Sequence, residues 1–141
     1  MANRPTERPR VGVGGIVGDG AGRVLLVQRG KEPGLGLWAF PGGRLEWGEA
    51  LRQGAEREVW EECGIRVKAG PLLYVSEMAG QAFHFIVLDY ACRWDGSPVR
   101  PGEDAADAAW FARDDAFALP LTDSMRPCLE NRGVMEFLGW A

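Results

Sequence analysis

The chain has 141 residues, of which 46% are hydrophobic and 26% charged, and its formal net charge at pH 7 is −4. This length and apolar content predict one domain with a sizeable core, and the acidic balance argues against binding to nucleic acid through clustered Lys and Arg. No run approaches the ~18 apolar residues of a membrane span, and the charged N-terminus lacks the apolar segment of a signal peptide. We therefore expect a cytoplasmic protein with no nucleic-acid or membrane partner.

The pattern along the chain predicts a flexible lead over residues 1–10 and a single domain over 11–141. Runs rich in β-branched and aromatic residues predict strands, at 11–17, 23–29, 38–40, 65–77, 82–93 and 108–111. The Gly-rich G-D-G-A-G after the first strand predicts a hairpin connection. Helices are predicted at about 49–63, 113–118 and 122–137. This order predicts an α+β or α/β sandwich with a mixed sheet. The segment D-G-S-P-V-R-P-G-E-D at 95–104 is expected to be a long functional or surface loop.

The central helix has an apolar stripe and a defined end. Leu51, Ala55 and Val59 recur at i, i+4 and i+8, so we expect them to face the core. Gly64 follows the last helical position, where glycine readily takes the left-handed conformation that ends a helix. These features predict an amphipathic helix that packs on the sheet.

Three glutamates crowd the same helix beside that stripe. At about 100° per residue, Glu58, Glu61 and Glu62 fall on one side. Like charges at this spacing repel, so we expect a cation to offset them. Arg57 can reach Glu61, but one guanidinium cannot neutralise three carboxylates and also serve Glu49. A bound divalent cation is the economical hypothesis, and oxygen ligands favour Mg²⁺ or Mn²⁺.

A solvated helix face is the competing interpretation, because runs such as R-E-V-W-E-E at residues 57–62 usually face water. The residues before the helix favour a site instead. A Pro-Gly-Gly turn and the loop over 42–49 can bring backbone carbonyls and the Glu49 side chain toward the carboxylates. Gly54, which costs about 1 kcal/mol against Ala within a helix, is expected on the carboxylate face, where a larger residue would obstruct the site.

Few residues suit other catalytic chemistry. His84 is the only histidine, and its alternating strand favours an ordinary sheet position. The cysteines Cys63, Cys92 and Cys128 are odd in number and show no C-x-x-C spacing, which predicts buried, reduced thiols rather than disulfides or a zinc site. A Ser-His-Asp or Cys-His hydrolase is therefore poorly supported.

The stretch from Gly43 to Ile65 resembles a known motif. Gly43, five residues, Glu49, seven residues and then R-E-V-W-E-E-C-G-I are similar to the Nudix box, G-x5-E-x7-R-E-U-x-E-E-x-G-U, where U is a bulky aliphatic residue. The flanks agree, with W-A-F-P-G-G before the box, L-L-V-Q-R upstream and W-F followed by D-D-A-F-A-L downstream. The likeness spans roughly residues 11–122.

The resemblance implies a Nudix fold, in which a mixed sheet lies between helices (α/β/α) and a loop-helix-loop holds Mg²⁺ or Mn²⁺. It implies hydrolysis of a nucleoside diphosphate linked to another moiety X, giving a nucleoside monophosphate and phosphorylated X. It implies as metal ligands the carboxylates of Glu58, Glu61 and Glu62 and the Gly42 carbonyl. Arg57 would orient Glu49 or Glu61 by an ion pair.

The resemblance also suggests a general base and residues that contact substrate. Relatives use either a box glutamate or an acidic residue on a later loop as the base, so Glu61 is our hypothesis and Glu103 and Asp104 are the loop candidates. Arg29, Trp38 and Asp104 are candidates for substrate contact, although strand-end arginines usually face solvent and tryptophans usually pack in the core.

Two functions remain open from the sequence. One is a metal-dependent hydrolase of an ADP-ribose-type or nucleoside triphosphate substrate, and the other is a sensor that binds a nucleotide metabolite without turnover. The intact box favours the hydrolase. A proline found after the box in some ADP-ribose enzymes is absent, since that window holds Gly80, Gln81 and Ala82. Because many relatives dimerise, the resemblance is also compatible with a homodimer.

Overall fold

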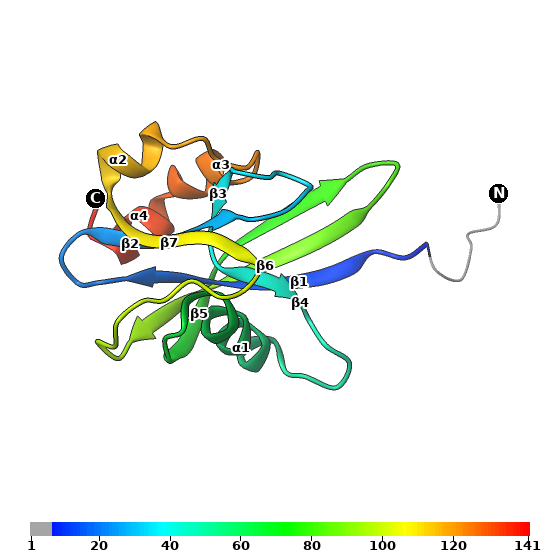
Figure 1. The fold of residues 1–141 in the computed structure, drawn as a ribbon, viewed down its shortest axis with the longest axis horizontal. Coiled ribbons are helices and arrows are strands. Elements are labelled where there is room, and N and C mark those ends of the chain that lie inside the picture. Colours follow the sequence, from blue (N-terminus) through cyan, green and yellow to red (C-terminus); the bar gives the residue numbers. More distant parts are fainter. Residues whose placement is uncertain (1–6) are drawn as a thin grey trace.

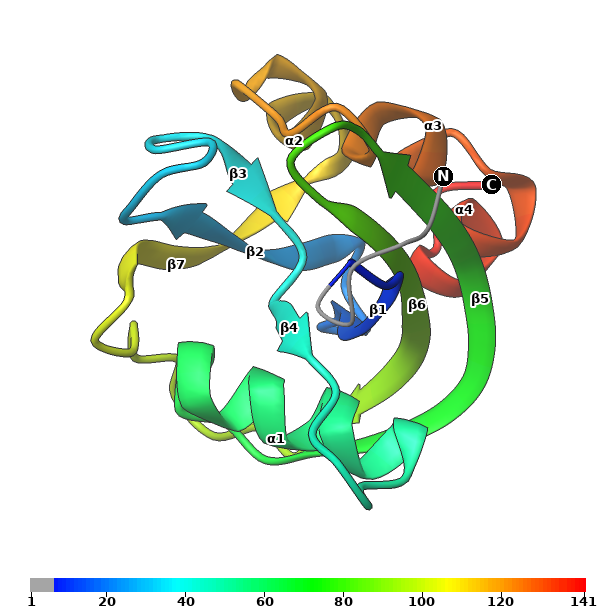
Figure 2. The ribbon, with the colours of Figure 1, turned by 90° about the vertical axis from the view of Figure 1, so that its right-hand side faces the viewer.

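A seven-stranded mixed sheet forms the centre of the computed structural model, which describes residues 7–141 (Figure 1). Its strands are β1 (Arg10–Gly18), β2 (Arg23–Arg29), β3 (Trp38–Ala39), β4 (Gly42–Arg44), β5 (Val67–Ala79), β6 (His84–Trp94) and β7 (Ala105–Ala112). The helices are α1 (Leu51–Cys63), α2 (Arg113–Ala118), α3 (Met125–Leu129) and α4 (Arg132–Leu138). Helix α1 covers one face of the sheet, and α2, α3 and α4 cover the other (Figure 2). The predicted α+β class and α/β/α layering are confirmed.

One parallel pair organises the strand order. β1 runs parallel to β6 over its whole length, and the other pairs in the described part of the chain are antiparallel. The path is β3-β2-β1-β6-β5, with β4 added beside β1 and β7 beside β2. The predicted hairpin of β1 and β2 is confirmed at its turn, where Gly18 pairs with Val24. Nearer the start of β1, β4 takes the neighbouring place, opposite Gly12 to Gly14.

Each face of the sheet has its own buried cluster, because side chains of a strand alternate between the two faces. The cluster beneath α1 includes Val13, Val17, Leu25, Val27, Ala55, Val59, Cys63 and Ile65. The cluster beneath α2, α3 and α4 includes Ile16, Val24, Leu26, Trp38, Ala116, Met125, Leu129 and Val134. Since β2 is buried on both faces, its apolar run is continuous rather than alternating.

Helix α1 begins two residues later than predicted. Glu49 belongs to the preceding loop, where its N–H donates to the Glu46 carbonyl at 3.0 Å. Ala50 is the extended N-cap, and its N–H donates to the Gln53 side chain at 3.2 Å. The helix ends as predicted at Gly64, whose φ is 68° and whose N–H donates to the carbonyl of the last turn.

The predicted core stripe of α1 is right at two positions and wrong at one. Ala55 and Val59 are fully buried, whereas Leu51 is 36% exposed at the first turn. Cys63 continues the stripe instead, four residues after Val59, and is fully buried. Leu51 is therefore only partly covered, although Arg52 in the same turn donates to the Gly70 carbonyl of β5 at 2.8 Å.

Gly54 does not lie where the sequence suggested. A Cβ at this position would lie 2.9 Å from Val13 Cγ2, 3.0 Å from Leu45 Cδ1 and 2.9 Å from Glu49 Oε1. The absent side chain therefore lets α1 approach β1 and leaves room for the Glu49 carboxylate. It does not open space among the glutamates at the other end of the helix.

The C-terminal helix predicted at 122–137 is two short helices. α3 ends at Leu129, and α4 begins after Asn131, whose side chain accepts a hydrogen bond from the Val134 N–H at 3.1 Å. Asparagine is a preferred N-cap because its side chain satisfies a free N–H of the first turn. This cap starts a second helix in another direction.

Other boundaries also differ from the sequence prediction. β4 was not predicted, because its Pro-Gly-Gly start indicates a turn; its glycines are instead strand residues that lie close to β1. Most of the predicted lead, residues 1–6, lies outside the described residues, while Arg10 already belongs to β1. No helix in the described part of the chain is long and apolar enough to cross a membrane.

The cysteines match their prediction. Cys63, Cys92 and Cys128 are all free and buried. Burial raises the pKa of Cys63 and of Cys92 to about 12, so these thiols stay protonated at neutral pH.

Gly54→Ala should lower the free energy of unfolding by about 1–3 kcal/mol, because a methyl group would be forced against Val13 and Leu45. This loss would outweigh the gain of about 1 kcal/mol in helix propensity. Gly133→Ala, at an exposed position of α4, is the control, since the nearest heavy atom to its Cβ would be the Asn131 side chain at 3.3 Å. Urea denaturation measures both variants, and equal stabilisation of both would contradict the close packing at Gly54.

Candidate functional site

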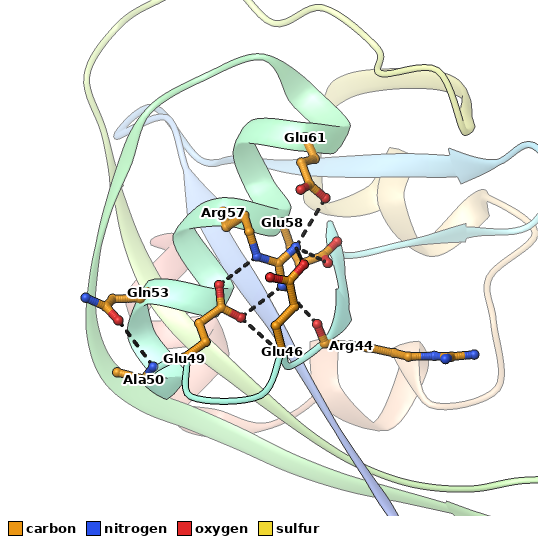
Figure 3. A network of polar contacts seen from close by, with 8 residues as sticks. All are labelled: Arg44, Glu46, Glu49, Ala50, Gln53, Arg57, Glu58 and Glu61. Atoms are coloured by element: carbon orange, nitrogen blue, oxygen red, sulfur yellow. Dashed lines mark hydrogen bonds and ion pairs between the residues drawn. The ribbon is translucent and has the colours of Figure 1, made fainter.

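Arg57 lies at the centre of a network of carboxylates on α1 and the loop before it (Figure 3). Its Nε donates to Glu49 Oε2 at 2.6 Å and its Nη2 donates to Glu49 Oε1 at 3.0 Å. Its Nη1 donates to Glu58 Oε1 at 2.8 Å and to Glu61 Oε2 at 3.2 Å. Its Nη2 also donates to the Arg44 carbonyl at 2.9 Å. One guanidinium thus joins the helix, the loop and the end of β4.

The ion pairs of Arg57 include both partners that the resemblance implies. The hydrogen bond from Arg57 holds the pKa of Glu49 below its ordinary value, and the same bond raises the pKa of Arg57. At Glu58 the balance is different. Burial raises the pKa of Glu58, and Glu61 adds repulsion in the same direction, although the hydrogen bond from Arg57 opposes both. Arg57 therefore fixes Glu49 fully but offsets the charge of Glu58 only in part.

Glu62 faces the first residue of β4. The Gly42 N–H donates to Glu62 Oε1 at 3.2 Å. Burial raises the pKa of Glu62 to about 7; the charges of Glu58 and Glu61 act in the same direction, while Gly42 and Arg29 oppose them. The three glutamates therefore repel one another, as their spacing in the sequence predicts.

The backbone of β4 passes directly against these carboxylates. A Cβ at Gly43 would lie 2.5 Å from Glu58 Oε2, and a Cβ at Gly42 would lie 2.7 Å from the Val13 carbonyl. Real Cβ atoms do not come this close to oxygen, so Gly42 cannot carry a side chain against the β1 backbone, and a side chain at Gly43 would displace the Glu58 carboxylate. The Pro-Gly-Gly sequence thus lets a strand lie within contact distance of the helix carboxylates.

The loop over residues 95–104 is tied to the C-terminal end of α1. The Arg100 N–H donates to the Cys63 carbonyl at 2.7 Å, and the Gly102 N–H donates to the Glu62 carbonyl at 2.8 Å. These bonds satisfy carbonyls that the end of a helix leaves free. Glu103 is exposed and follows directly, so the structure brings the backbone of this loop candidate to the same end of α1 as Glu61.

Two of the three candidates for substrate contact, Arg29 and Trp38, lie in different surroundings. Arg29 is exposed at the end of β2, where its Nε donates to the Pro33 carbonyl at 2.6 Å, and it is close enough to Glu62 to lower that carboxyl's pKa. Trp38 is buried in the second cluster, in edge-on contact with Phe111 at a ring distance of 5.0 Å. Its packing therefore supports a core role.

The third candidate for substrate contact is a loop acid, Asp104, and a further residue considered from the sequence is the histidine. Asp104 pairs with Lys31 at 3.0 Å, and both side chains are exposed. His84 begins β6 and lies 2.9 Å from Glu77 on β5, as a sheet residue would. Among the tryptophans, Trp47 is fully exposed on the loop before α1.

The donor chemistry of the cluster fits a hard cation, but its side chains are not arranged around one. No group of three or more His, Cys, Asp or Glu side chains within residues 7–141 stands in a metal-binding arrangement. The reason is visible in the contacts: Arg57 holds Glu58 and Glu61, while Glu62 accepts from the Gly42 N–H. Oxygen donors with excess negative charge suit Mg²⁺ or Mn²⁺, and rotation of these side chains would be needed to bind it.

Sequence reasoning missed one buried acid, Asp89 on β6. Its side chain is on the sheet face opposite α1, the residue is 7% exposed, and burial raises its pKa to about 7. The available signal was an aspartate inside the apolar run F-I-V-L-D-Y, where a strand buried on both faces is expected to be apolar throughout.

Comparison with known proteins gives the family. The model of the NUDIX domain matches residues 8–131, which include the strands, α1 and the carboxylate cluster. The chain belongs to the Nudix family. The predicted family and fold are therefore confirmed, and several relatives are named as hydrolases.

Individual relatives have different substrates. The NAD-capped RNA hydrolase NudC of Chromobacterium violaceum is 33% identical over 118 residues, which are 83% of this chain and 44% of that protein. The 8-oxo-dGDP phosphatase NUDT18 of Danio rerio is 37% identical over 115 residues, which are 79% of this chain and 34% of that protein. This chain therefore spans less than half the length of these relatives.

A solved structure covers the fold more completely. The MutT NUDIX hydrolase from Burkholderia pseudomallei is 34% identical, with a TM-score of 0.81, and the match covers 89% of this chain and 99% of that one. The fold predicted from the sequence is thus confirmed by a whole-chain comparison.

Arg57→Gln should destabilise the protein, because Glu49 and Glu58 would lose their cation. For a partly buried network we expect a loss of about 2–4 kcal/mol in the free energy of unfolding, measured by urea denaturation. Arg132→Gln is the matched control, since its pair with Glu136 at 3.6 Å is exposed and should contribute almost nothing. An equal loss in both variants would show that Arg57 has no special structural role.

Asp89→Asn should stabilise the protein above neutral pH. Because the pKa of Asp89 is raised to about 7, the folded protein keeps a proton that the unfolded chain releases at lower pH. The unfolding free energy therefore falls as pH rises from the ordinary carboxyl pKa to about 7, and asparagine removes this loss.

Chemical denaturation at two pH values tests this effect. The stability difference between Asp89→Asn and the wild type should increase by about 2 kcal/mol between about pH 5 and pH 8. Glu62, whose pKa is also raised, is present in both proteins and cancels from the comparison. A difference that does not change with pH would mean that Asp89 titrates like an exposed carboxyl.

Proposed function

We propose that this chain hydrolyses the diphosphate bond of a nucleoside diphosphate linked to another moiety X, with Mg²⁺ or Mn²⁺, to give a nucleoside monophosphate and phosphorylated X. The observation that supports this most directly is the carboxylate cluster around Arg57, held beneath the glycines of β4. Membership of the Nudix family supports the same reaction class.

The carboxylates of Glu58, Glu61 and Glu62 and the Gly42 carbonyl are the proposed ligands of the cation. When bound, such a cation neutralises the diphosphate and lowers the pKa of a water molecule. The repulsion among the three glutamates supports this assignment, because it is relieved by a positive charge.

Arg57 has a positioning role in this proposal. Its two-point contact with Glu49 fixes the loop before α1, and its contact with Glu58 orients that carboxylate below β4. Two-point contacts between guanidinium and carboxylate set direction as well as distance. The cluster is therefore rigid on the Glu49 side and adjustable on the side of Glu61.

Glu61 is the proposed general base, which accepts a proton from the attacking water. Its side chain is 53% exposed and is held by one 3.2 Å contact with Arg57, so it can turn toward a water without breaking the core. Glu103 is the alternative base, because its loop is bonded to the same end of α1. Arg29 and Asp104 are proposed to contact substrate from exposed positions near this end.

The substrate proposal stays at the level of an ADP-ribose-type compound or a nucleoside triphosphate. The two relatives described above act on NAD-capped RNA and on 8-oxo-dGDP, according to their names, and both are longer than this chain. A small nucleotide as the partner, a cytoplasmic location and a homodimer remain predictions.

A hydrolysis assay tests the function. The full chain is incubated with Mg²⁺ and a panel of dinucleotides, nucleoside diphosphate sugars and nucleoside triphosphates, and the release of nucleoside monophosphate is followed by anion-exchange chromatography. Glu62→Gln and Glu61→Gln should each lower kcat by about 100-fold or more. Glu136→Gln, on exposed α4, is the control and should leave kcat unchanged.

Three outcomes separate the alternatives. Turnover that survives in Glu62→Gln would contradict the proposed cation site. A greater loss in Glu103→Gln than in Glu61→Gln would move the general base to the loop. Tight nucleotide binding with no turnover of any substrate would favour the sensor.

A further inference from the structure

Asp89 has no partner within the described part of the chain. It lies on β6 between Gly14 of β1 and Tyr74 of β5, and it is 7% exposed. No hydrogen bond or ion pair joins it to residues 7–141. In that range, every side-chain oxygen or nitrogen that is fully buried has a hydrogen-bond partner. The Asp89 carboxylate must therefore reach solvent from an otherwise buried position.

The space beside Asp89 is created by a glycine. A Cβ at Gly14 would lie 2.5 Å from Asp89 Oδ1 and 2.9 Å from the Pro41 carbonyl, so any larger residue would displace the carboxylate. The same missing side chain brings Asp89 next to the Pro-Gly-Gly turn. The next residue of that turn, Gly42, donates to Glu62 of the carboxylate cluster. Asp89 and the cluster thus lie near the same turn, on different faces of the sheet.

Side chains on the sheet face of Asp89 are more deeply buried toward one end of β6 than toward the other. Toward one end of β6, Tyr74 packs with the second buried cluster, and the charge of Asp89 is felt by Cys128 on α3. Toward the other end, Val87 and Phe85 are half-buried and belong to neither cluster. Figure 2 shows β3 and β4 on one side of β1 and the curved β6 and β5 on the other.

Gly12 continues this half-covered strip toward β4. A Cβ at Gly12 would lie 3.3 Å from Val87 Cγ2 and 3.5 Å from the Gly43 carbonyl. The strip therefore consists of the Val87 side chain against Gly12, the neighbouring Phe85 side chain, and the Asp89 carboxylate against Gly14. Binding sites for small molecules commonly combine an apolar lining with a few polar groups that fix orientation.

A carboxylate without a partner favours ligands that donate hydrogen bonds. Its two oxygens, side by side, accept hydrogen bonds from two adjacent N–H groups. Guanine presents two adjacent donors, the ring N–H and the exocyclic amine, whereas adenine and cytosine place an acceptor next to their amine. A carboxylate kept buried without a partner costs free energy, which such a ligand would recover.

We propose that Asp89 recognises the base of the substrate, by accepting the two adjacent N–H donors of a guanine-type ring that lies on the strip formed by Gly12, Val87 and Phe85. This inference rests on the proposed function, because it assumes that the substrate is a nucleotide. It adds which base that nucleotide carries and places the base on the sheet face opposite α1. The name of the Danio rerio relative, an 8-oxo-dGDP phosphatase, is consistent with a guanine-derived substrate.

Binding without turnover tests this recognition. The full chain is titrated in EDTA with GMP, with IMP, which lacks the exocyclic amine, and with AMP, and heats of binding are recorded by calorimetry. GMP should bind the wild type about tenfold more tightly than IMP, the difference expected for one hydrogen bond to a charged acceptor. Asp89→Asn should bind GMP and IMP equally, because its amide offers one acceptor and one donor.

The control variant is Asp115→Asn, an exposed change of the same charge on α2, and it should keep the preference for GMP. A circular dichroism melt verifies that both variants are folded. Equal binding of the three nucleotides by the wild type, no binding of any of them, or an unchanged preference in Asp89→Asn would each overturn the proposal. Hydrolysis with no preference for guanine would overturn the role of Asp89 and leave the proposed function standing. A preference for guanine without hydrolysis would support the role of Asp89 and contradict the proposed function.

Discussion

The pairing of Arg57 with Glu49 is the interaction on which the carboxylate cluster depends. Its two hydrogen bonds, at 2.6 and 3.0 Å, join the middle of α1 to the loop that leads into it. The same guanidinium also bonds the Arg44 carbonyl, so it ties the end of β4 to the helix beside the separate bond from Gly42 to Glu62. The remaining donor, Nη1, is shared between Glu58 and Glu61, so neither is fully compensated.

Because Arg57 is shared in this way, the site is held rigidly but keeps negative charge that Arg57 does not neutralise. A second arginine could have neutralised Glu62, but the backbone of β4 occupies the place beside it, and the bond from Gly42 is the main compensation. Burial then raises the pKa of Glu62 to about 7. Strain of this electrostatic kind lowers stability and is common at functional sites, where a ligand relieves it.

The sequence predicted those parts of the structure that depend on local spacing. The helix and its end at Gly64 follow from short-range patterns, and the carboxylate cluster follows from spacings of three and four residues. β4 could not be predicted this way, because pairing with β1 across about thirty residues makes a strand of a glycine-rich turn. Leu51 was misassigned because periodicity locates a helix face but does not show how completely each side chain on that face is covered.

Asp89 escaped prediction for a related reason, since its surroundings come from two other strands and from the turn at Pro41. Gly14 gives it space, Tyr74 lies across from it, and the Pro41 carbonyl closes one side. With Glu62, it makes a pair of buried carboxylates near the Pro-Gly-Gly turn, each with a pKa of about 7. A nucleotide has an anionic end, which needs a cation, and a base with N–H donors, which needs an acceptor. In the proposed arrangement Glu62 helps to hold the cation that binds the anionic end, and Asp89 accepts the N–H donors of the base. The turn between them therefore sets the direction in which the substrate lies.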